Sequence, residues 1–524
     1  MDNMGDEISS ITVVGGGDAG LLAALALRKV NPDVDVAVVD DFREPPTEVG
    51  QGTFQSIVPL LHDVLGIDEG RFLREVKPVW KGSSYFRDWC GYEPFHYAFD
   101  VRSVKPEPDD PKSVESLYHY YETGDMSTPA EGIVDHGKTP LVYAPGQDSY
   151  VMYPNMAYHL SVGRFNEFLR TLCEERGVPL VDDRITDVET NADGTRIAAV
   201  HGASGATYEA DLYVDSTGFK RLLMSELDAS YRSFDIPLDT AVRAAADRPL
   251  SEIVPATVLE TGEHGWFWQI DTYDARSLGY VFSSDHVSDE DALAEFRAHR
   301  EEDLGEVDYY RFDSGFYEET WVGNCVATGN AQGFIEPLQA TSLTTHLNTA
   351  LRLSRRLAAR GRINDAGFRE SYNRYVRGSW NSVYDFISIH YRFAEGDTEF
   401  WEDMQSIPIS DRVREYIDYF DANGFELFDT ELVTEEGNPR GMLAFPTSSL
   451  YFVMRHMGAE SSFYEDNEFA VSDEIKERWR QRNGYVEDLA DTCLSYEQVY
   501  KSGLVDSYFR NERAFAQAAA PSGR

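Results

Sequence analysis

Three glycines near the amino terminus have the type and spacing to bind the phosphates of a nucleotide. Gly15, Gly17 and Gly20 follow a β-branched run at residues 11–14 and precede an apolar segment at 21–30. The pattern predicts a strand, a tight turn and a helix whose N-terminus faces the phosphates while the turn lets the backbone approach them. A glycine-rich turn without a ligand is the alternative interpretation.

An acidic residue at the expected distance extends this pattern. Asp40 ends a second predicted strand at 34–39 and lies twenty residues after Gly20, where a carboxylate can bind a ribose hydroxyl. Asp18 and Ala19, in the turn itself, complete the predicted dinucleotide contacts. NAD and FAD share this fingerprint, so it does not by itself choose between them.

Two later segments favour FAD. Residues 211–218 and 327–333 each end a predicted strand in a turn of small residues, and they resemble the FAD-contacting strands of the flavoprotein monooxygenase superfamily. The resemblance implies flavin contacts from Gly218 and from Asn330, which stands where that superfamily commonly has aspartate. No second glycine fingerprint follows, so the sequence predicts no built-in NAD(P)H site and implies a separate flavin reductase as the source of FADH2.

Three further segments resemble one family of flavin enzymes, the flavin-dependent tryptophan halogenases. Residues 79–89 are similar to that family's lysine-bearing strand, 265–271 to its Trp-x-Trp-x-Ile-Pro signature, and 334–342 to its Phe-x-x-Pro-x-x-Ser-x-Gly segment. The similarity runs in order over about 11–395. It implies an enzyme in which reduced FAD, O2 and chloride or bromide yield hypohalous acid, which a closed tunnel leads to an electron-rich aromatic substrate.

The resemblance assigns roles to four side chains on the substrate side. Lys81 would receive the halogen, by hydrogen bonding to hypohalous acid or by forming a haloamine; an exposed lysine without a role is the alternative. Trp266 and Trp268, on one face of a predicted strand, would separate the flavin from the substrate, unless they are simply core tryptophans. His96 lies near the family's substrate-stacking aromatic residues, and a structural histidine is the other interpretation. Asp271 stands where the family has proline.

The third segment differs from the family pattern at several positions. Gln339 stands where the family has a glutamate that takes the ring proton or stabilises the cationic intermediate, and a neutral amide cannot act as a general base. Ala340 replaces a serine, and Ser342 replaces a glycine that helps to hold the halide. The resemblance still implies a halide site at Thr341 and Ser342, and a cofactor contact at Leu343.

The charge of the chain excludes several kinds of partner. Its 524 residues include 47 Lys plus Arg and 91 Asp plus Glu, a formal net charge of −44, which repels nucleic acid and anionic membranes. The acids are spread along the whole chain and only nine residues are lysine, a pattern typical of proteins from salt-loving microbes. An ordinary acidic protein is the alternative.

The sequence also predicts the compartment. No apolar run is long enough to span a membrane, the first residues carry no secretory pattern, and the four cysteines have neither metal-ligand nor disulfide spacing. We therefore expect a reduced, cytoplasmic protein without a metal site. The oligomeric state is left open, with a homodimer as one alternative.

The predicted fold is α/β, a Rossmann-type, flavoprotein monooxygenase-like FAD module with a mostly helical substrate-binding cap. The module would span residues 1–395, with a substrate-side excursion at 85–150. A helical region would follow at 396–515 and a flexible tail at 516–524. Within the module, a helix is predicted to begin at an N-cap, Thr53.

The leading functional hypothesis is a flavin-dependent halogenase acting on a tryptophan-like or indole-like ring. The alternative is an FAD-dependent monooxygenase or oxidoreductase on the same scaffold, without halogen transfer. A third hypothesis is a flavin-binding protein that has lost catalysis through the change at residue 339. The sequence does not choose chloride over bromide.

Overall fold

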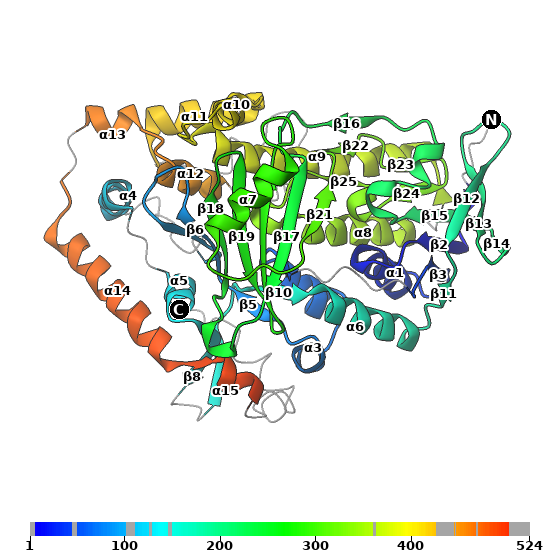
Figure 1. The fold of residues 1–524 in the computed structure, drawn as a ribbon, viewed down its shortest axis with the longest axis horizontal. Coiled ribbons are helices and arrows are strands. Elements are labelled where there is room, and N and C mark those ends of the chain that lie inside the picture. The colour runs from blue at the N-terminus through cyan, green and yellow to red at the C-terminus, as the bar shows by residue number, and fades with distance from the viewer. Residues whose placement is uncertain are drawn as a thin grey trace.

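The computed structural model describes residues 6–43, 50–100, 111–124, 128–144, 149–359, 363–425, 445, 447–467 and 470–501. The predicted tail at 516–524 lies outside these residues. Two large β-sheets and the helices packed around them form the described part of the chain (Figure 1). The expected α/β fold is confirmed.

The glycine-rich turn belongs to a six-stranded sheet. The pairs are parallel except for β24 and β23, which are antiparallel. Helix α1 contacts both α6 and α8 (Figure 1). In order across the sheet the strands are β11 (Leu180–Asp182), β3 (Asp35–Asp40), β2 (Ser10–Val14), β15 (Leu212–Asp215), β24 (Cys325–Ala327) and β23 (Trp321–Val322). The helices are α1 (Asp18–Val30), α6 (Val162–Glu175) and α8 (Ser342–Ala359).

A seven-stranded sheet lies beside the first and carries the tryptophan segment. All of its pairs are antiparallel except β18 with β6, which is parallel. Helix α7 (Asp289–His299) packs on β20, and the Ser288 hydroxyl caps it by accepting from the Asp291 N–H at 3.2 Å. In order the strands are β21 (Asp308–Arg311), β17 (Thr240–Ala246), β20 (Arg276–Phe282), β19 (Gly265–Asp271), β18 (Ala256–Thr261), β6 (Ser83–Asp88) and β7 (Phe95–Ala98).

Smaller sheets complete the strand pairing. One of them, β4 (Gly50–Gly52), β10 (Ala157–Ser161) and β5 (Val79–Lys81), holds the predicted lysine strand. The others are β12 (Ile185–Thr190), β13 (Ile197–Gly202) and β14 (Thr207–Tyr208); β16 (Tyr231–Ser233), β22 (Gly315–Tyr317) and β25 (Gly333–Phe334); β27 (Cys493–Ser495), β8 (Lys138–Ala144) and β9 (Ser149–Met152); and β1 (Asp6–Glu7) with β26 (Ile363–Asn364).

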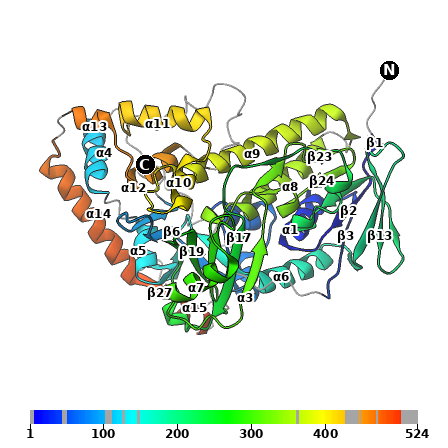
Figure 2. The ribbon, with the colours of Figure 1, turned by 45° about the horizontal axis from the view of Figure 1, so that its top comes forward.

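Helices dominate the carboxyl-terminal part of the described chain. Helix α14 runs beside α4 and α5, which come from the middle of the sequence, and β27 pairs with β8 (Figures 1 and 2). Elements α4, α5 and β8 therefore pack against elements from the carboxyl-terminal part of the chain. These helices are α4 (Pro111–Thr123), α5 (Pro129–Asp135), α9 (Ala366–Arg392), α10 (Glu399–Ser406), α11 (Asp411–Asn423), α12 (Thr447–His456), α13 (Ser462–Asp466), α14 (Asp473–Thr492) and α15 (Tyr496–Lys501).

Short helical turns connect the larger elements. They are α2 (Ile57–Pro59), η1 (Leu60–Val64), α3 (Glu69–Glu75), η3 (Gly218–Lys220), η4 (Met224–Glu226), η5 (Leu250–Glu252), η6 (Gly329–Ala331) and η7 (Leu338–Ala340). The helix predicted from Thr53 begins only at Ile57, because the Thr53 hydroxyl donates to the Tyr158 carbonyl of β10 instead of capping a helix. Among the described residues, no helix combines the length and hydrophobicity needed to cross a bilayer.

Candidate functional site

The glycine-rich turn forms a cradle that opens outward. A Cβ atom at Gly15, whose φ is +107°, would fall 2.3 Å from the Ser216 carbonyl oxygen, and one at Gly20 would fall 2.1 Å from the Gly15 oxygen. Those glycines let β2, β15 and α1 pack closely. At Gly17 no atom lies within 4 Å of the Cβ position. The space before the α1 N-terminus is therefore open to a phosphate group.

Two carboxylates lie at this turn. Asp40 accepts a hydrogen bond from the Gly16 N–H at 2.7 Å, which ties β3 to the turn. Asp18 accepts from Asn166 of α6 at 3.1 Å. Burial raises the pKa of Asp18 to about 7, against the opposing effects of Asn166 and of the positive charge on Arg170. At neutral pH this carboxyl is thus only partly ionised, which reduces its repulsion of a phosphate.

The remaining predicted FAD residues gather at the same edge. The turns after β2, β15 and β24 lie together, because these strands are parallel and their carboxyl ends meet. A Cβ at Gly329 would be 2.9 Å from the Ala19 Cβ, so η6, which contains Asn330, backs onto α1. Gly218 has open space around its Cβ position, and Leu343 is buried in the first turn of α8. This arrangement fits a dinucleotide laid across the strand ends.

The predicted lysine is buried inside the protein. Lys81 ends β5 with no exposed surface, and its Nζ makes no hydrogen bond to the described residues. The Nζ lies 5.3 Å from the centre of the Phe99 ring. Burial lowers the pKa of Lys81 to about 7. A large fraction of the amine is therefore neutral, and nucleophilic, near neutral pH.

The predicted amide sits in a hydrogen-bonded chain. Ser84 of β6 donates its hydroxyl to Gln339 Oε1 at 2.9 Å, and Gln339 Nε2 lies 2.9 Å from His390 Nε2 of α9. All three residues are buried. Gln339 and Ala340 both have positive φ, +66° and +52°, in a conformation that costs of order 1–3 kcal/mol for residues with a side chain.

The sequence motifs did not point to Ser84 or His390. Ser84 lies inside the segment that resembles the lysine-bearing strand, and the alternation of side chains along β6 could have indicated which face of the sheet it lies on. Nothing local in the sequence points from residue 339 to His390 on a different helix.

The Thr257 hydroxyl lies between the surroundings of Gln339, which we call the amide side, and those of Lys81, which we call the lysine side. Thr257 of β18 is the register partner of Ser84, and its Oγ1 lies 2.9 Å from His159 Nε2. His159 is buried, and burial together with the charge of Lys81 lowers its pKa well below the ordinary value. A Cβ at Gly52 would be 3.1 Å from the Ala340 Cβ and 3.4 Å from the Thr257 hydroxyl. The two predicted catalytic residues therefore border one buried polar region.

The two tryptophans lie on the same face of β19, as the alternation predicts. Trp266 and Trp268 are both buried, with ring centres 6.2 Å apart and planes at 62°. Trp268 covers Gly279 of β20, where a Cβ would fall 1.9 Å from the indole ring. Glu336 lies next to Trp266 and Tyr391, and burial raises the pKa of Glu336 to about 8.

The predicted halide residues lie where an anion is favoured electrostatically. Thr341 is buried and Ser342 begins α8, an 18-residue helix. The free N–H groups and the dipole at a helix N-terminus stabilise negative charge. This end of α8 directly follows η7, which carries Gln339.

His96 is placed on the other side of the sheet from Gln339. It pairs with Tyr85 across β7 and β6, and because side chains alternate it lies on the face opposite Ser84. Its Nδ1 is 2.9 Å from the Ser83 hydroxyl, and its Nε2 is 3.1 Å from Asp135. The structure therefore does not bring His96 to the amide.

Asp271, which stands at the family's proline position, forms hydrogen bonds and ion pairs with neighbouring residues. Its carboxylate is fully buried and accepts from Arg276 Nε at 2.9 Å and from the Val254 N–H at 2.8 Å. Arg248 Nε lies 3.6 Å away. The charge at the end of β19 is therefore neutralised within the protein.

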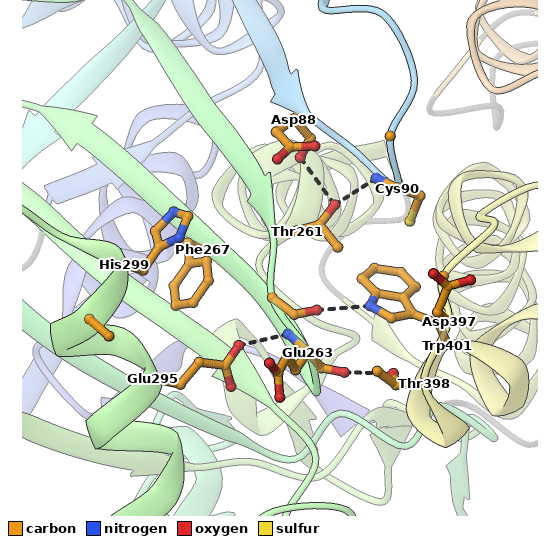
Figure 3. A pocket seen from close by; sticks show the side chains of 14 residues that line it. Asp88, Cys90, Thr261, Glu263, Phe267, Glu295, His299, Asp397, Thr398 and Trp401 are labelled. Carbon is orange, nitrogen blue, oxygen red and sulfur yellow. Dashed lines mark hydrogen bonds between the residues drawn. The ribbon is translucent and has the colours of Figure 1, made fainter.

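A pocket of about 470 Å³ lies elsewhere, between the ends of β18 and β19 and helix α10 (Figure 3). Trp401 Nε1 donates to the Gly262 carbonyl at 2.8 Å along its wall. Its carboxylates make it a poor site for halide. They are Asp88, Glu263, Glu295 and Asp397. None of the predicted site residues lines this pocket.

The parallel strands and their glycine cradle define a Rossmann-type, dinucleotide-binding module. The family description "tryptophan halogenase" matches residues 10–469. The chain belongs to the tryptophan halogenase family. It is accordingly an enzyme of the flavin-dependent halogenase type, which uses reduced FAD, O2 and halide.

Individual relatives agree with this assignment. The chain is 28% identical over 447 residues to tryptophan 7-halogenase RebH of Lentzea aerocolonigenes, covering 80% of this chain and 83% of the relative. It is 28% identical to 7-chloro-L-tryptophan 6-halogenase KtzR of Kutzneria sp. (strain 744), covering 81% and 86%.

Solved structures show the same architecture. MibH, described as a lanthipeptide tryptophan 5-halogenase, superposes with a TM-score of 0.81 at 27% identity, covering 100% of this chain and 97% of MibH. BrvH, a flavin-dependent halogenase from Brevundimonas sp. BAL3, gives 0.78 at 25% identity, covering 95% and 99%.

Proposed function

We propose that this enzyme chlorinates or brominates an electron-rich, indole-like aromatic ring, and that Lys81 transfers the halogen. The observation that carries this proposal is the fully buried Lys81 amine, which makes no hydrogen bond within the described chain and has a pKa near neutrality. Exposed lysines are cationic at neutral pH and cannot attack an electrophile. The relatives' names supply the indole ring as the substrate class.

The residues at the strand ends are suited to holding FAD. The open cradle at Gly17 would take the pyrophosphate, and Gly218 and Asn330 would approach the flavin. When bound and reduced, FAD supplies hypohalous acid from O2 and halide. The α1 and α8 N-termini favour the phosphates and the halide respectively, and the buried indoles of Trp266 and Trp268 exclude water between the flavin side and the ring.

Lys81 performs the transfer in two balanced steps. Its neutral amine attacks the halogen of hypohalous acid, so that an N–X bond forms, the O–X bond breaks, and the amine proton leaves with the hydroxide as water. The aromatic carbon then attacks the halogen, the N–X bond breaks, and the ring loses a proton while the amine regains one. Because burial disfavours the charged form of Lys81, the amine returns to its neutral form.

We also infer the cellular compartment of the enzyme and the source of its reduced flavin. A net charge of −44 with few lysines supports the cytoplasm of a salt-loving microbe, and the four cysteines are free, as in a reducing compartment. FADH2 would come from a separate reductase. The net charge of −44 argues against nucleic acid and anionic membranes as partners.

The test is product analysis. Enzyme, free FAD, a flavin reductase, NADH and bromide are incubated with a panel of indoles, pyrroles and phenols, and products are weighed by mass spectrometry. We expect bromine in the product and no NADH oxidation when the reductase is omitted. A gain of oxygen alone would identify a monooxygenase, and NADH consumption no faster than flavin autoxidation, without product, would identify a flavin-binding protein.

A further inference from the structure

We propose that His390 is a positioning residue that holds the Gln339 amide in one orientation, and that the two side chains form a neutral, hydrogen-bonded pair. Its catalytic meaning rests on the proposed halogenation. The pairing itself rests on geometry: two hydrogen bonds join β6, η7 and α9, and a third, within α9, orients the His390 ring.

The tautomer of His390 follows from its two contacts. Its Nδ1 lies 2.8 Å from the Phe386 carbonyl oxygen, which can only accept, so Nδ1 carries the hydrogen. The Nε2 of the neutral ring is then an acceptor. Since Gln339 Nε2 lies 2.9 Å from it, the amide donates this hydrogen bond.

The orientation of the amide follows in turn. A flipped amide would set its carbonyl oxygen against the lone pair of His390 Nε2, two acceptors at hydrogen-bonding distance. In the observed orientation Oε1 accepts from Ser84, whose neighbour on β18, Thr257, contacts His159. The amide carbonyl is thereby fixed toward the Ser84 hydroxyl.

The surroundings of His390 keep it uncharged. Phe86 of β6 stacks on the imidazole at 5.5 Å, and Phe386 meets it edge-on at 4.8 Å. Trp89 Nε1 donates to the His390 backbone carbonyl rather than to the ring. Burial lowers the pKa of His390 to about 4, opposed only by backbone contacts at residues 386 and 387, so no charged side chain in the described chain shifts it.

This environment explains why an amide suits position 339. A glutamate there would place its charge against the lone pair of His390, and a proton on the histidine or on the glutamate itself would be needed to relieve that repulsion. A proton on the histidine would create a buried ion pair with a desolvation penalty. The amide–imidazole pair avoids this penalty, and a neutral amide cannot take a proton from a substrate ring. On the proposed function, the enzyme would therefore favour rings that lose their proton readily to water.

Nuclear magnetic resonance of the histidine rings tests the pair without any assay of activity. Protein labelled with 15N and 13C in histidine is titrated from pH 5 to 8, and His390 is assigned by its loss in His390→Gln. We expect His390 to stay neutral, as the Nδ1–H tautomer, throughout. In Gln339→Glu we expect it to be an imidazolium at pH 7. His346, buried on α8 with Nε2 3.2 Å from the Gly333 carbonyl, should not change and serves as the control.

Two results would overturn the pair: an Nε2–H tautomer in the parent protein, or titration of His390 near its ordinary pKa of about 6.5. Both are measured on the parent, so a poorly folded variant does not affect them. If the spectra show the expected neutral Nδ1–H tautomer but no halogenated product forms, the hydrogen-bonded pair is supported and the proposed function is refuted.

Kinetics test the positioning role. His390→Leu removes the acceptor, and a misplaced amide should lower kcat by about 10²-fold while KM and FAD affinity stay the same. His390→Gln retains an acceptor oxygen and should recover part of this loss. Equal losses in both variants, or a change confined to KM, would refute a positioning role.

Discussion

Ser84 and Thr257 lie side by side on the parallel strands β6 and β18, and each uses its hydroxyl to bind a different buried side chain. Ser84 donates to Gln339, whereas Thr257 contacts Nε2 of His159, whose Nδ1 lies 3.1 Å from the Asp271 carbonyl. One strand pair thus organises both sides of the polar region between the lysine and the amide.

Replacing Lys81 with methionine, which is similar in length, should abolish halogenated product while FADH2 is still oxidised by O2. The reason is that the amine is needed only to transfer the halogen, whereas the flavin reaction takes place at the cradle. Liquid chromatography with mass spectrometry and an oxygen electrode measure the two. Lys77→Met removes a half-buried lysine whose Nζ lies 4.4 Å from the centre of the Tyr273 ring, and it is the matched control. Undiminished halogenation by Lys81→Met would refute the transfer role.

The same residue should couple stability to pH. Lys81 has a pKa of about 7 when folded and 10.5 ordinarily, so between these values the unfolded chain binds the extra proton. Stability gained from this group should therefore rise with pH across that window, by at most about 1.4 kcal/mol per unit. Urea unfolding of parent and Lys81→Met at pH 7.5 and 9 isolates it, because other groups cancel in the difference. A difference in free energy independent of pH would contradict the burial of a neutral amine.

Substitutions at two glycines of the fingerprint should have different effects. Gly17→Leu should fold normally and lose FAD binding, because its side chain enters open space where the pyrophosphate would lie. Gly20→Leu should instead fail to fold, because its Cβ would fall 2.1 Å from a backbone oxygen. Circular dichroism and flavin fluorescence titration distinguish the outcomes. FAD binding by Gly17→Leu with unchanged affinity would show that the cofactor lies elsewhere.

Asp271 should be far more important to stability than a nearby exposed acid. Asp271→Ala leaves Arg276 and Arg248 without their buried counter-charge, and we expect a loss of about 3–5 kcal/mol in the free energy of unfolding. Asp274→Ala breaks a partly exposed pair with Arg164 and should cost at most about 1 kcal/mol. Equal losses in chemical denaturation would contradict this ranking.

Salt should stabilise the folded chain. The net charge of −44 makes the compact state repel itself, and molar KCl shortens the Debye length to about 3 Å. We expect Tm to rise steadily from dilute buffer to about 1 M KCl. A Tm that does not respond would refute adaptation to a salty cytoplasm.

Local patterns predicted the strand, turn and helix around the glycines, because these glycines act through their own backbone and their strands are parallel neighbours. The amide side was beyond local reasoning. Ser84 and Gln339 are 255 residues apart, and Gln339 and His390 are 51 apart, so only tertiary packing brings them together. Thr53 shows the same limit: its type suits an N-cap, yet the neighbouring strand takes its hydroxyl.

The parallel pairing of β6 with β18 also has a consequence for how the chain folds. Residue 84 cannot meet residue 257 until 173 further residues have been synthesised, and α9 must follow later still. Contacts of such long sequence separation form slowly, because the chain entropy is lost before they are gained. The strand, turn and helix of the cradle come from the first 40 residues and their packing partner β15 ends at Asp215, whereas the amide side must await nearly 400. On the ribosome, the chain can therefore shape its nucleotide turn long before it can complete the amide side of its site.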